Sequence, residues 1–410
     1  MIASVRWGDI QSHADRNAVT RLLKIVGGAI LLLVVIGALI VTIVPQFLDR
    51  IYYRGATSGH FDGARFFNPD GDADTKQIQP KGSGGGRASF FWKYFTGSDG
   101  RPEWPKSVAV NRIAPPARVE GERMVVTWVG HASVLIQTQG LNILTDPVWA
   151  EKTGPLGTGP RRVAEPGIAF DALPRIDLVL VSHNHYDHLD KATLKRLWQR
   201  DRPRIVTSLG NDSVIGQTGA QATALDWGQR VAIKPGVSVT VTRNHHWGSR
   251  WFTDRNRALW SSFVVTLPGG NVFFAGDTGM GDGQWPGEAA ALGPIRLALI
   301  PIGAFRFVDG QMESGSHIGP VDAVEVYRRL GAAHAIAIHW GTFRLSFEGY
   351  DTPPKLLAAA MRCTGQTGFE PVAIGRPTEV AGYVKPVTVT PMARAALLRC
   401  LDTPQVRALR

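Results

Sequence analysis

The most informative stretch of this 410-residue chain reads Ser182-His183-Asn184-His185-Tyr186-Asp187-His188-Leu189-Asp190. It directly follows residues 176–181, an almost entirely apolar run that is typical of a strand buried on both faces. Three imidazoles and one carboxylate fall within six positions, a pattern whose chance occurrence is on the order of one in a thousand. Imidazoles this close repel one another when protonated, whereas neutral imidazoles can share a divalent cation. The stretch therefore predicts a metal site on a loop at the end of a buried strand.

Further ligand-type residues follow downstream, as a site for two metal ions would require. They are His245, His246, Asp277 and His339. Each lies where an apolar strand gives way to a loop, the usual place for a ligand held on a rigid scaffold. Adjacent strand residues point to opposite faces, so we expect only one of His245 and His246 to be a ligand.

Cysteine offers no alternative metal site. The chain has two cysteines, Cys363 and Cys400, which are too few for a disulfide scaffold, and it has no Cys-x-x-Cys pair. We therefore expect histidine and carboxylate ligands, and the cysteines say little about the redox compartment.

The hydrophobic pattern predicts short strands interleaved with helices. Strands are expected at residues 125–129, 133–138, 142–145, 176–181, 204–207, 238–242, 261–266, 272–275, 297–300 and 335–338. Helices are expected at residues 190–199, at residues 320–330 with a proline in the first turn, and at residues 353–361 with Thr352 as the cap. This order indicates helices packed outside sheets, and no internal repeat is evident.

Residues 25–44 form a run of twenty residues without a charge. As a helix this run is long enough for the ~30 Å hydrocarbon core of a bilayer. A signal peptide would have a shorter apolar run of ~7–15 residues, and a buried core helix is rarely apolar on all sides. The run therefore predicts a membrane anchor. Lys and Arg are in excess before it, which predicts that the large domain lies on the non-cytoplasmic side.

The composition fits a membrane-anchored globular protein. Hydrophobic residues make up 44% of the chain and charged residues 19%, which supports a large core and excludes a wholly disordered chain. The formal net charge of +11 raises the possibility of nucleic-acid binding, but the basic residues form no dense run and no known nucleic-acid motif. Attraction to an anionic membrane surface explains the charge more simply. The expected segments are a basic N-terminus at 1–24, the anchor at 25–44, a linker and arm at 45–121, a catalytic domain at 122–385 and a tail at 386–410.

These motifs resemble the metallo-β-lactamase superfamily and, more closely, the N-acylphosphatidylethanolamine-hydrolysing phospholipase D family with its bacterial relatives. The matching stretches are residues 60–63, 66–69, 127–133, 144–147, 159–162, 173–177, 183–190, 246–247, 273–279, 300–304 and 338–343. They occur in collinear order across roughly residues 60–355, outside the apolar run at 25–44. The resemblance implies an α/β fold in four layers, the αββα sandwich, preceded here by one transmembrane helix.

The resemblance also implies the roles of individual residues. One zinc ion would be bound by His183, His185 and His246, a second by Asp187, His188 and His339, and Asp277 would bridge the two. Asp187 and His317 would act in catalysis, with His317 near the reacting phosphate, and Asp146 and His131 would orient ligands. Ser249 departs from the family pattern, because a lysine often stands there.

The function implied is hydrolysis of the phosphodiester of N-acylphosphatidylethanolamine, a phospholipid, to N-acylethanolamine and phosphatidic acid. The alternatives are another substrate on the same site, such as ascorbate-phosphate lactone or another phosphodiester, and a non-enzymatic scaffold. Arg161 and Arg162 are expected near the entrance, where they would attract anionic headgroups. Five aromatic residues could line an acyl-chain groove or belong to the core: Trp149, Phe305, Phe307, Trp340 and Phe343. The oligomeric state stays open.

Overall fold

The computed structural model describes residues 7–47, 50–75, 101–251, 253–307, 311–312, 314–387 and 389–409. Contacts divide the chain into two units, Met1–Arg50 and Ile51–Arg410. Of the expected linker and arm at 45–121, residues 48–49 and 76–100 lie outside the described residues. Residues 51–75 and the expected tail at 386–410 belong to the larger unit.

The smaller unit is the helix α1 (Trp7–Phe47), which contains the predicted apolar run. Its segment Ala18–Ile40 has a mean hydropathy of 2.7 and no buried residues. At ~1.5 Å per residue, the 23 residues of this segment are long enough to cross a bilayer core. The prediction of an N-terminal helix that could span a membrane is therefore confirmed.

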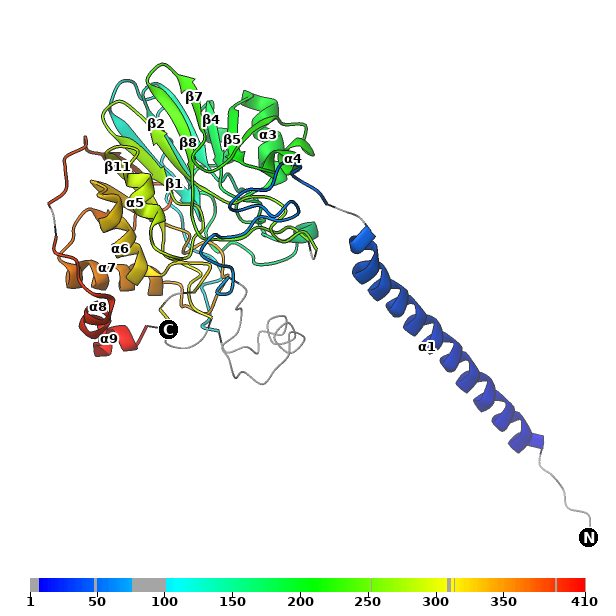
Figure 1. The fold of residues 1–410 in the computed structure, drawn as a ribbon. Coiled ribbons are helices and arrows are strands. Elements are labelled where there is room, and N and C mark those ends of the chain that lie inside the picture. The colour runs from blue at the N-terminus through cyan, green and yellow to red at the C-terminus, as the bar shows by residue number, and fades with distance from the viewer. Residues whose placement is uncertain are drawn as a thin grey trace, which may run out of the picture. The chain divides into compact units, whose positions relative to one another are not determined.

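The larger unit contains two sheets of seven strands each (Figure 1). In spatial order, the first sheet consists of β14 (Pro377–Val380), β1 (Met124–Gly130), β2 (Ser133–Thr138), β3 (Leu141–Thr145), β4 (Leu178–Val181), β5 (Arg204–Ser208) and β6 (Ala222–Leu225). The second consists of β13 (Phe369–Glu370), β12 (His334–Ile338), β11 (Ile295–Pro301), β10 (Asn271–Phe274), β9 (Ser262–Thr266), β8 (Val237–Thr242) and β7 (Arg230–Lys234). In this order the first sheet is antiparallel from β14 to β3 and parallel from β3 to β6. The second sheet is parallel from β13 to β10 and antiparallel from β10 to β7.

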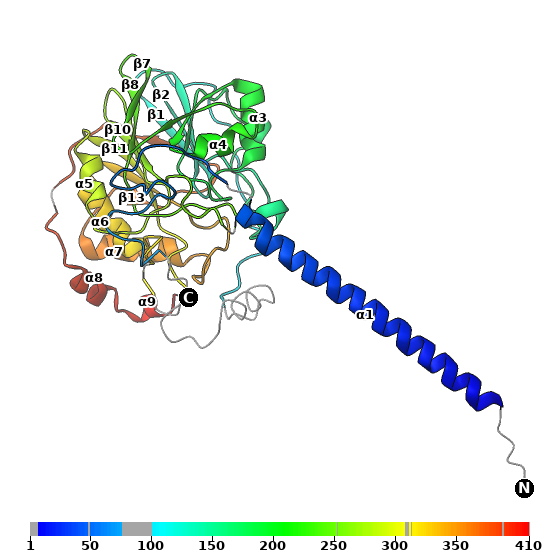
Figure 2. The same cartoon turned by 45° about the vertical axis from the view of Figure 1, so that its right-hand side comes forward.

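Helices cover the outer face of each sheet (Figures 1 and 2). The helices α3 (Lys191–Asp201) and α4 (Asn211–Gly216) pack on the first sheet. The second sheet is covered by α5 (Trp285–Ala290), α6 (Pro320–Leu330) and α7 (Thr352–Thr364). A third apolar cluster fills the space between the two sheets. The expected four-layer αββα sandwich is confirmed.

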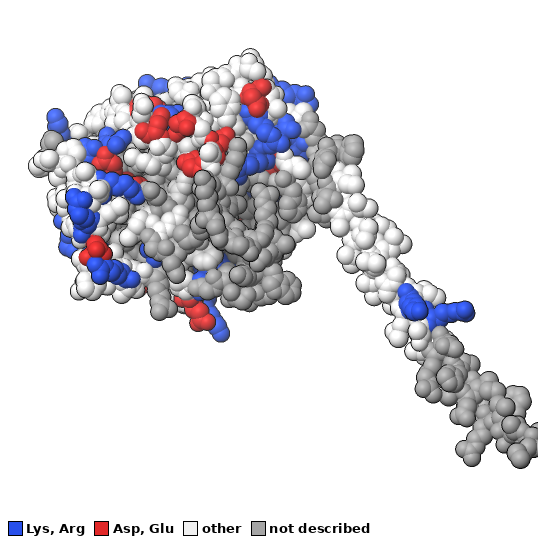
Figure 3. Space-filling model, turned by 60° about the horizontal axis from the view of Figure 1, so that its bottom comes forward, with Lys and Arg blue, Asp and Glu red and all other residues white. Residues whose placement is uncertain are grey.

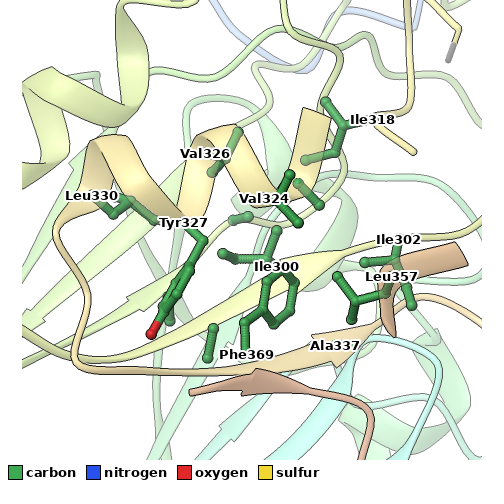
Figure 4. Packing of buried hydrophobic residues seen from close by; sticks show 14 of the residues in the cluster. Ile300, Ile302, Ile318, Val324, Val326, Tyr327, Leu330, Ala337, Leu357 and Phe369 are labelled. Atoms are coloured by element: carbon green, nitrogen blue, oxygen red, sulfur yellow. The ribbon is translucent and has the colours of Figure 1, made fainter. Parts of the chain in front are cut away.

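In β11 successive side chains point to opposite faces of the sheet, which shows how the sequence specifies these layers. Ala298 and Ile300 face the helices, whereas Leu297 and Leu299 face the other sheet, so the strand is buried on both sides. Figure 4 shows Ile300 below α6, with the side chains of Val324 and Tyr327 directed toward the sheet. The nearly continuous apolar runs of the sequence therefore correspond to strands between two apolar layers.

Local signals set the ends of the main helices. The side chain of Asp190 accepts hydrogen bonds from the backbone N–H groups of Ala192 and Thr193 and so caps α3. Pro320 is the first residue of α6, and Gly331 ends it with a φ of 56°. The prediction that Thr352 caps α7 is wrong by one position, because the helix begins at Thr352.

The C-terminal segment is folded onto the domain. The helix α8 (Arg394–Leu401) precedes α9 (Pro404–Arg407), and Leu397 and Leu401 of α8 are buried in the core below α7. A disulfide joins Cys363 of α7 to Cys400 of α8. The cysteine count did not reveal this pairing, because the two residues are 37 positions apart in the sequence and come together only through helix packing.

We predict that Cys363→Ser/Cys400→Ser destabilises the protein by about 3–4 kcal/mol, because the disulfide closes a loop of 37 residues in the unfolded chain. Urea unfolding of the variant and the wild type measures this difference. Mass spectrometry after alkylation under denaturing, non-reducing conditions gives the control. Two alkylated thiols in protein from an oxidising compartment would contradict the disulfide.

Candidate metal centre

The ligand-type residues converge at one edge of the sandwich, where strands of both sheets end. His183, His185, Asp187 and His188 follow β4 of the first sheet. His246 follows β8, Asp277 follows β10 and His339 follows β12, all in the second sheet. The two sheets thus contribute to a single site, as the positions of these residues at strand ends predict.

His183, His185, His246 and Asp277 form the first group, in which one ligand atom of each lies within 4.8 Å of the others. His185 Nδ1 lies 2.8 Å from His183 Nε2 and 3.4 Å from His246 Nε2. All four residues are buried or nearly so. The three histidines of this group are those that the family resemblance assigns to one metal ion.

Asp187, His188, His339 and His131 form the second group within the same distance limit. His131 Nε2 lies 2.9 Å from Asp187 Oδ2, and His339 Nε2 lies 3.7 Å from the same oxygen. The first distance is that of a hydrogen bond to a candidate ligand, and the ring centre of His131 is 4.1 Å from that of His339. The sequence motif Gly130-His131 contained this residue, but only the structure brings it into the group.

Asp277 lies between the two groups. Its Oδ2 atom is 3.0 Å from His188 Nε2, 3.9 Å from His246 Nε2 and 4.0 Å from His183 Nε2, and its Oδ1 atom is 3.1 Å from His339 Nε2. A carboxylate in this position can bridge two cations.

The site fits metal ions because many of its buried polar atoms lack a hydrogen-bond partner among the described residues. They are His131 Nδ1, His185 Nε2, His188 Nε2, both carboxylate oxygens of Asp277, His317 Nδ1 and both ring nitrogens of His339. Buried polar atoms without a partner cost free energy, and native proteins contain few of them. Imidazole and carboxylate are ligands that zinc prefers, so bound cations would satisfy these atoms.

The electrostatics favour the deprotonated forms of His131, His185 and Asp277, whereas nearby carboxylates raise the pKa of His188 and of His339. Burial lowers the pKa of His185 and of His131 to about 3. Burial alone would raise the pKa of Asp277, but the nearby His188 and His339 hold it well below the usual range of a carboxyl group. Burial also opposes protonation of His339, yet Asp277 and Asp187 raise the pKa of this residue to about 9. The same carboxylate charges that attract a proton to His339 would attract a divalent cation.

The neighbouring polar residues orient the ligands. Asp146 Oδ2 lies 2.6 Å from His188 Nδ1, and the carboxylate accepts hydrogen bonds from the backbone N–H and the hydroxyl of Ser182. His246 Nδ1 donates to the carbonyl oxygen of Ser316 at 2.9 Å, which directs Nε2 toward the site. Asp146 is thus in the place that the sequence analysis expected.

His317 lies at the rim of the site. Its Nδ1 is 3.7 Å from Asp277 Oδ2, and its ring centre is 5.2 Å from that of His246. Burial lowers the pKa of His317 to about 4, so its imidazole is neutral at physiological pH. A neutral imidazole here can donate a hydrogen bond to an oxygen atom held at the site.

Arg250, which the sequence analysis did not single out, contacts the loop of candidate ligands. Its guanidinium donates to the carbonyl oxygens of Asn184 and Leu189 and lies 3.9 Å from the ring centre of Tyr186. It therefore braces the His183–Asp190 loop from the segment that follows His246. Ser249, which replaces the lysine of the family pattern, donates to Asp254 within the same segment.

The prediction that Arg162 lies near the entrance, where it would attract anionic headgroups, is wrong. Arg162 is buried, donates to the carbonyl oxygens of Val148 and Ala150, and lies over the ring of Phe343. Burial lowers its pKa to about 10. Arg161 is exposed and paired with Glu151 at 2.7 Å. On the face seen in Figure 3, the described basic and acidic side chains of the larger unit are interspersed.

The chain is similar to known metal-dependent hydrolases. Residues 141–340 match the family model of the beta-lactamase superfamily domain. The N-acyl-phosphatidylethanolamine-hydrolyzing phospholipase D 1 of Caenorhabditis elegans is 36% identical over 244 residues, which are 57% of this chain and 68% of the relative. The mitochondrial enzyme of the same name from Saccharomyces cerevisiae is 31% identical over 246 residues, 58% of this chain and 52% of the relative.

A solved structure with a similar backbone is Igni18, a metallo hydrolase from Ignicoccus hospitalis. It is 19% identical and has a TM-score of 0.49, over 64% of this chain and all of that one. The sequence relatives, together with strand ends that gather histidine and carboxylate from both sheets, show that this chain belongs to the metallo-β-lactamase superfamily.

Proposed function

We propose that this protein is a zinc-dependent phospholipase D that hydrolyses N-acylphosphatidylethanolamine to N-acylethanolamine and phosphatidic acid. The observation that carries the proposal is a cluster of candidate ligands suited to two cations in a chain whose relatives are N-acyl-phosphatidylethanolamine-hydrolyzing phospholipases D. The seven proposed metal ligands are His183, His185, Asp187, His188, His246, Asp277 and His339.

Two zinc ions bound by these residues would supply Lewis acidity, which acidifies a water molecule and neutralises charge on the phosphoryl oxygens. In our proposal the residues of the chain hold the reacting groups in place. His131 donates to Asp187 at 2.9 Å and fixes its carboxylate, which accepts a hydrogen bond from the attacking water. His317, with its neutral imidazole at the rim, donates to an oxygen of the phosphate.

A cavity lined mainly by apolar side chains, although by none of the candidate ligands, supports a lipid substrate. Trp340 directly follows the ligand His339 and lines a cavity of about 600 Å³ together with Trp128 and Tyr350. The rings of Trp128 and Trp340 are 5.1 Å apart. Such a cavity is suited to an alkyl chain.

The remaining aromatics of the expected groove have other contacts. Phe305 and Phe343 are buried in the core, and the indole N–H of Trp149 donates to the carbonyl oxygen of Ile168. Phe307 is half-buried, and its backbone N–H donates to the side chain of Gln311. Of the five expected residues, Trp340 is therefore the one on which we base the acyl-chain site.

The helix α1 and the disulfide together support a membrane-anchored enzyme whose catalytic domain lies outside the cytoplasm. An apolar segment of 23 residues would keep the enzyme at the bilayer, where a lipid substrate is concentrated. The Cys363–Cys400 disulfide is of a kind that forms in oxidising compartments, and it agrees with the charge bias around α1.

We predict about two zinc ions per chain in zinc-replete protein, and fewer in His246→Ala, because this substitution removes a ligand. His245→Ala should keep the stoichiometry of the wild type, since the side chain points elsewhere. Elemental analysis by mass spectrometry measures both values. A reproducible content of one or zero zinc ions in the wild type would count against the dinuclear site.

We predict that the enzyme cleaves N-acylphosphatidylethanolamine in mixed micelles and leaves the phosphate on the diacylglycerol product. Asp187→Asn should lower kcat by about 10²–10⁴-fold, because an amide cannot serve as a proton acceptor. Chromatography of the lipid products is the measurement, and chelator treatment followed by zinc addition is the control. Turnover of lactones with no turnover of any phosphodiester lipid would favour the lactonase alternative.

We predict that a reporter fused to the C-terminus is active when it is one that matures in an oxidising compartment, such as alkaline phosphatase. A matched fusion of a fluorescent protein that matures only in the cytoplasm should stay dark. The opposite pattern would reverse the topology, and recovery of the full-length protein in the soluble fraction would remove the anchor.

A further inference from the structure

His245 is a buried histidine that adjoins the metal centre without belonging to it. Its Nδ1 atom lies 3.1 Å from Asp70 Oδ1, and its Nε2 atom lies 3.0 Å from Asp74 Oδ1. Both ring nitrogens therefore face carboxylates of the segment 68–75. Among the described residues, His245 is in none of the clusters that could hold a metal ion.

The segment 68–75 also holds the backbone of the neighbouring ligand. The side-chain amide of Asn68 donates to the carbonyl oxygen of His246 at 2.8 Å. The carbonyl oxygen of this amide accepts from the indole N–H of Trp260 at 3.1 Å, which fixes the orientation of Asn68. The segment 68–75 thus contacts the side chain of His245 and the backbone carbonyl group of His246.

The same contacts extend to the loop after Asp277. Asp70 Oδ2 accepts from the backbone N–H of Asp282 at 2.7 Å. The backbone of His245 donates to the hydroxyl of Thr278 at 3.1 Å and accepts from the N–H of Gly279 at 2.6 Å. A Cβ atom at Gly281 would lie 2.6 Å from His245 Nδ1, so only glycine fits in this tightly packed turn.

Asp74 contacts the loop that carries His317. A Cβ atom at Gly315 would lie 2.5 Å from the Cβ of Asp74, which shows how closely the two segments approach. The backbone N–H of Ile318 donates to the carbonyl oxygen of Thr278 at 2.7 Å. The loops that carry Asp277 and His317 are therefore connected to each other and to the segment 68–75.

We infer that His245, held between Asp70 and Asp74, is a positioning residue of the metal centre, and that the segment 68–75 is part of that centre. The segment 68–75, together with His245, fixes the strand end that carries His246 against the turn that follows Asp277. Ligands held in this way cannot move apart without breaking buried contacts, which slows the release of metal. The inference rests on metal binding by the proposed site and is independent of the substrate.

The test is the rate of zinc release from the zinc-loaded full-length protein to an excess of a chromophoric chelator. His245→Ala and Asp70→Asn should release zinc about 10–100-fold faster than the wild type, the usual effect of losing a partner that orients a ligand. The double variant should be no faster than His245→Ala alone, because both substitutions break the same contact. The zinc content before release should stay at the wild-type value.

His60→Ala provides a matched control. His60 lies in the same N-terminal arm and pairs with Asp226 at 2.7 Å. Its ring stacks on Phe66 and Trp227, which are not candidate ligands. This variant should lose stability without a change in the rate of zinc release. If His245→Ala fails to fold, Asp74→Asn tests the contact at the other ring nitrogen of His245, since it keeps the shape of the half-exposed side chain.

Three results would overturn the inference. One is wild-type release from a folded His245→Ala or Asp74→Asn protein, and another is equal acceleration in His60→Ala. The third is the loss of one zinc ion from His245→Ala, which would make His245 a ligand. None of these results depends on whether N-acylphosphatidylethanolamine is cleaved.

Discussion

The carboxylate of Asp277 belongs to the first group of candidate ligands and lies against the second, with Oδ2 3.0 Å from His188 Nε2 and Oδ1 3.1 Å from His339 Nε2. His188 belongs to a loop of the first sheet, whereas Asp277 and His339 follow strands of the second. These distances exist only while the two sheets keep their relative position. The apolar layer between the sheets is therefore a requirement of the site, because close-packed side chains resist small displacements. Asp146 and Arg250 then refine the orientation of individual loops.

Much of the fold could be predicted from the sequence because the signals were local. The apolar run at 176–181 contains β4, and the proline and glycine around residues 320–331 mark the ends of α6. The candidate ligands could be found because histidines and carboxylates concentrate at strand ends, and the structure brings all seven of them together. His246 and His245 could be told apart only by the family pattern, and the ring of His245 indeed points to Asp70 and Asp74.

What the sequence did not reveal depends on contacts between distant parts of the chain. The strands β6, β7, β13 and β14 are the edge strands of the two sheets and are only partly buried, so they lack the apolar runs of the central strands. The helices α4, α5, α8 and α9 have at most eight residues, too few for a clear helical periodicity. Arg162 looked like a surface residue, but its guanidinium lies among backbone carbonyl groups that arrive only when the loop folds. The disulfide and the role of residues 68–75 likewise arise from tertiary packing.

The strand β14 pairs with β1 across almost the whole domain, and Arg123 beside β1 contacts Glu379 in β14, 256 residues away. Ribosomes make β1 long before β14, so one edge of the first sheet stays open throughout most of synthesis. Such an edge offers unpaired backbone groups to any other strand, including those of a neighbouring nascent chain. The strand that closes this edge and the second cysteine both lie near the C-terminus. Closure of the sheet and cross-linking of α8 therefore both wait for the synthesis of residues far from β1, and until β14 pairs, the open edge is exposed to mispairing.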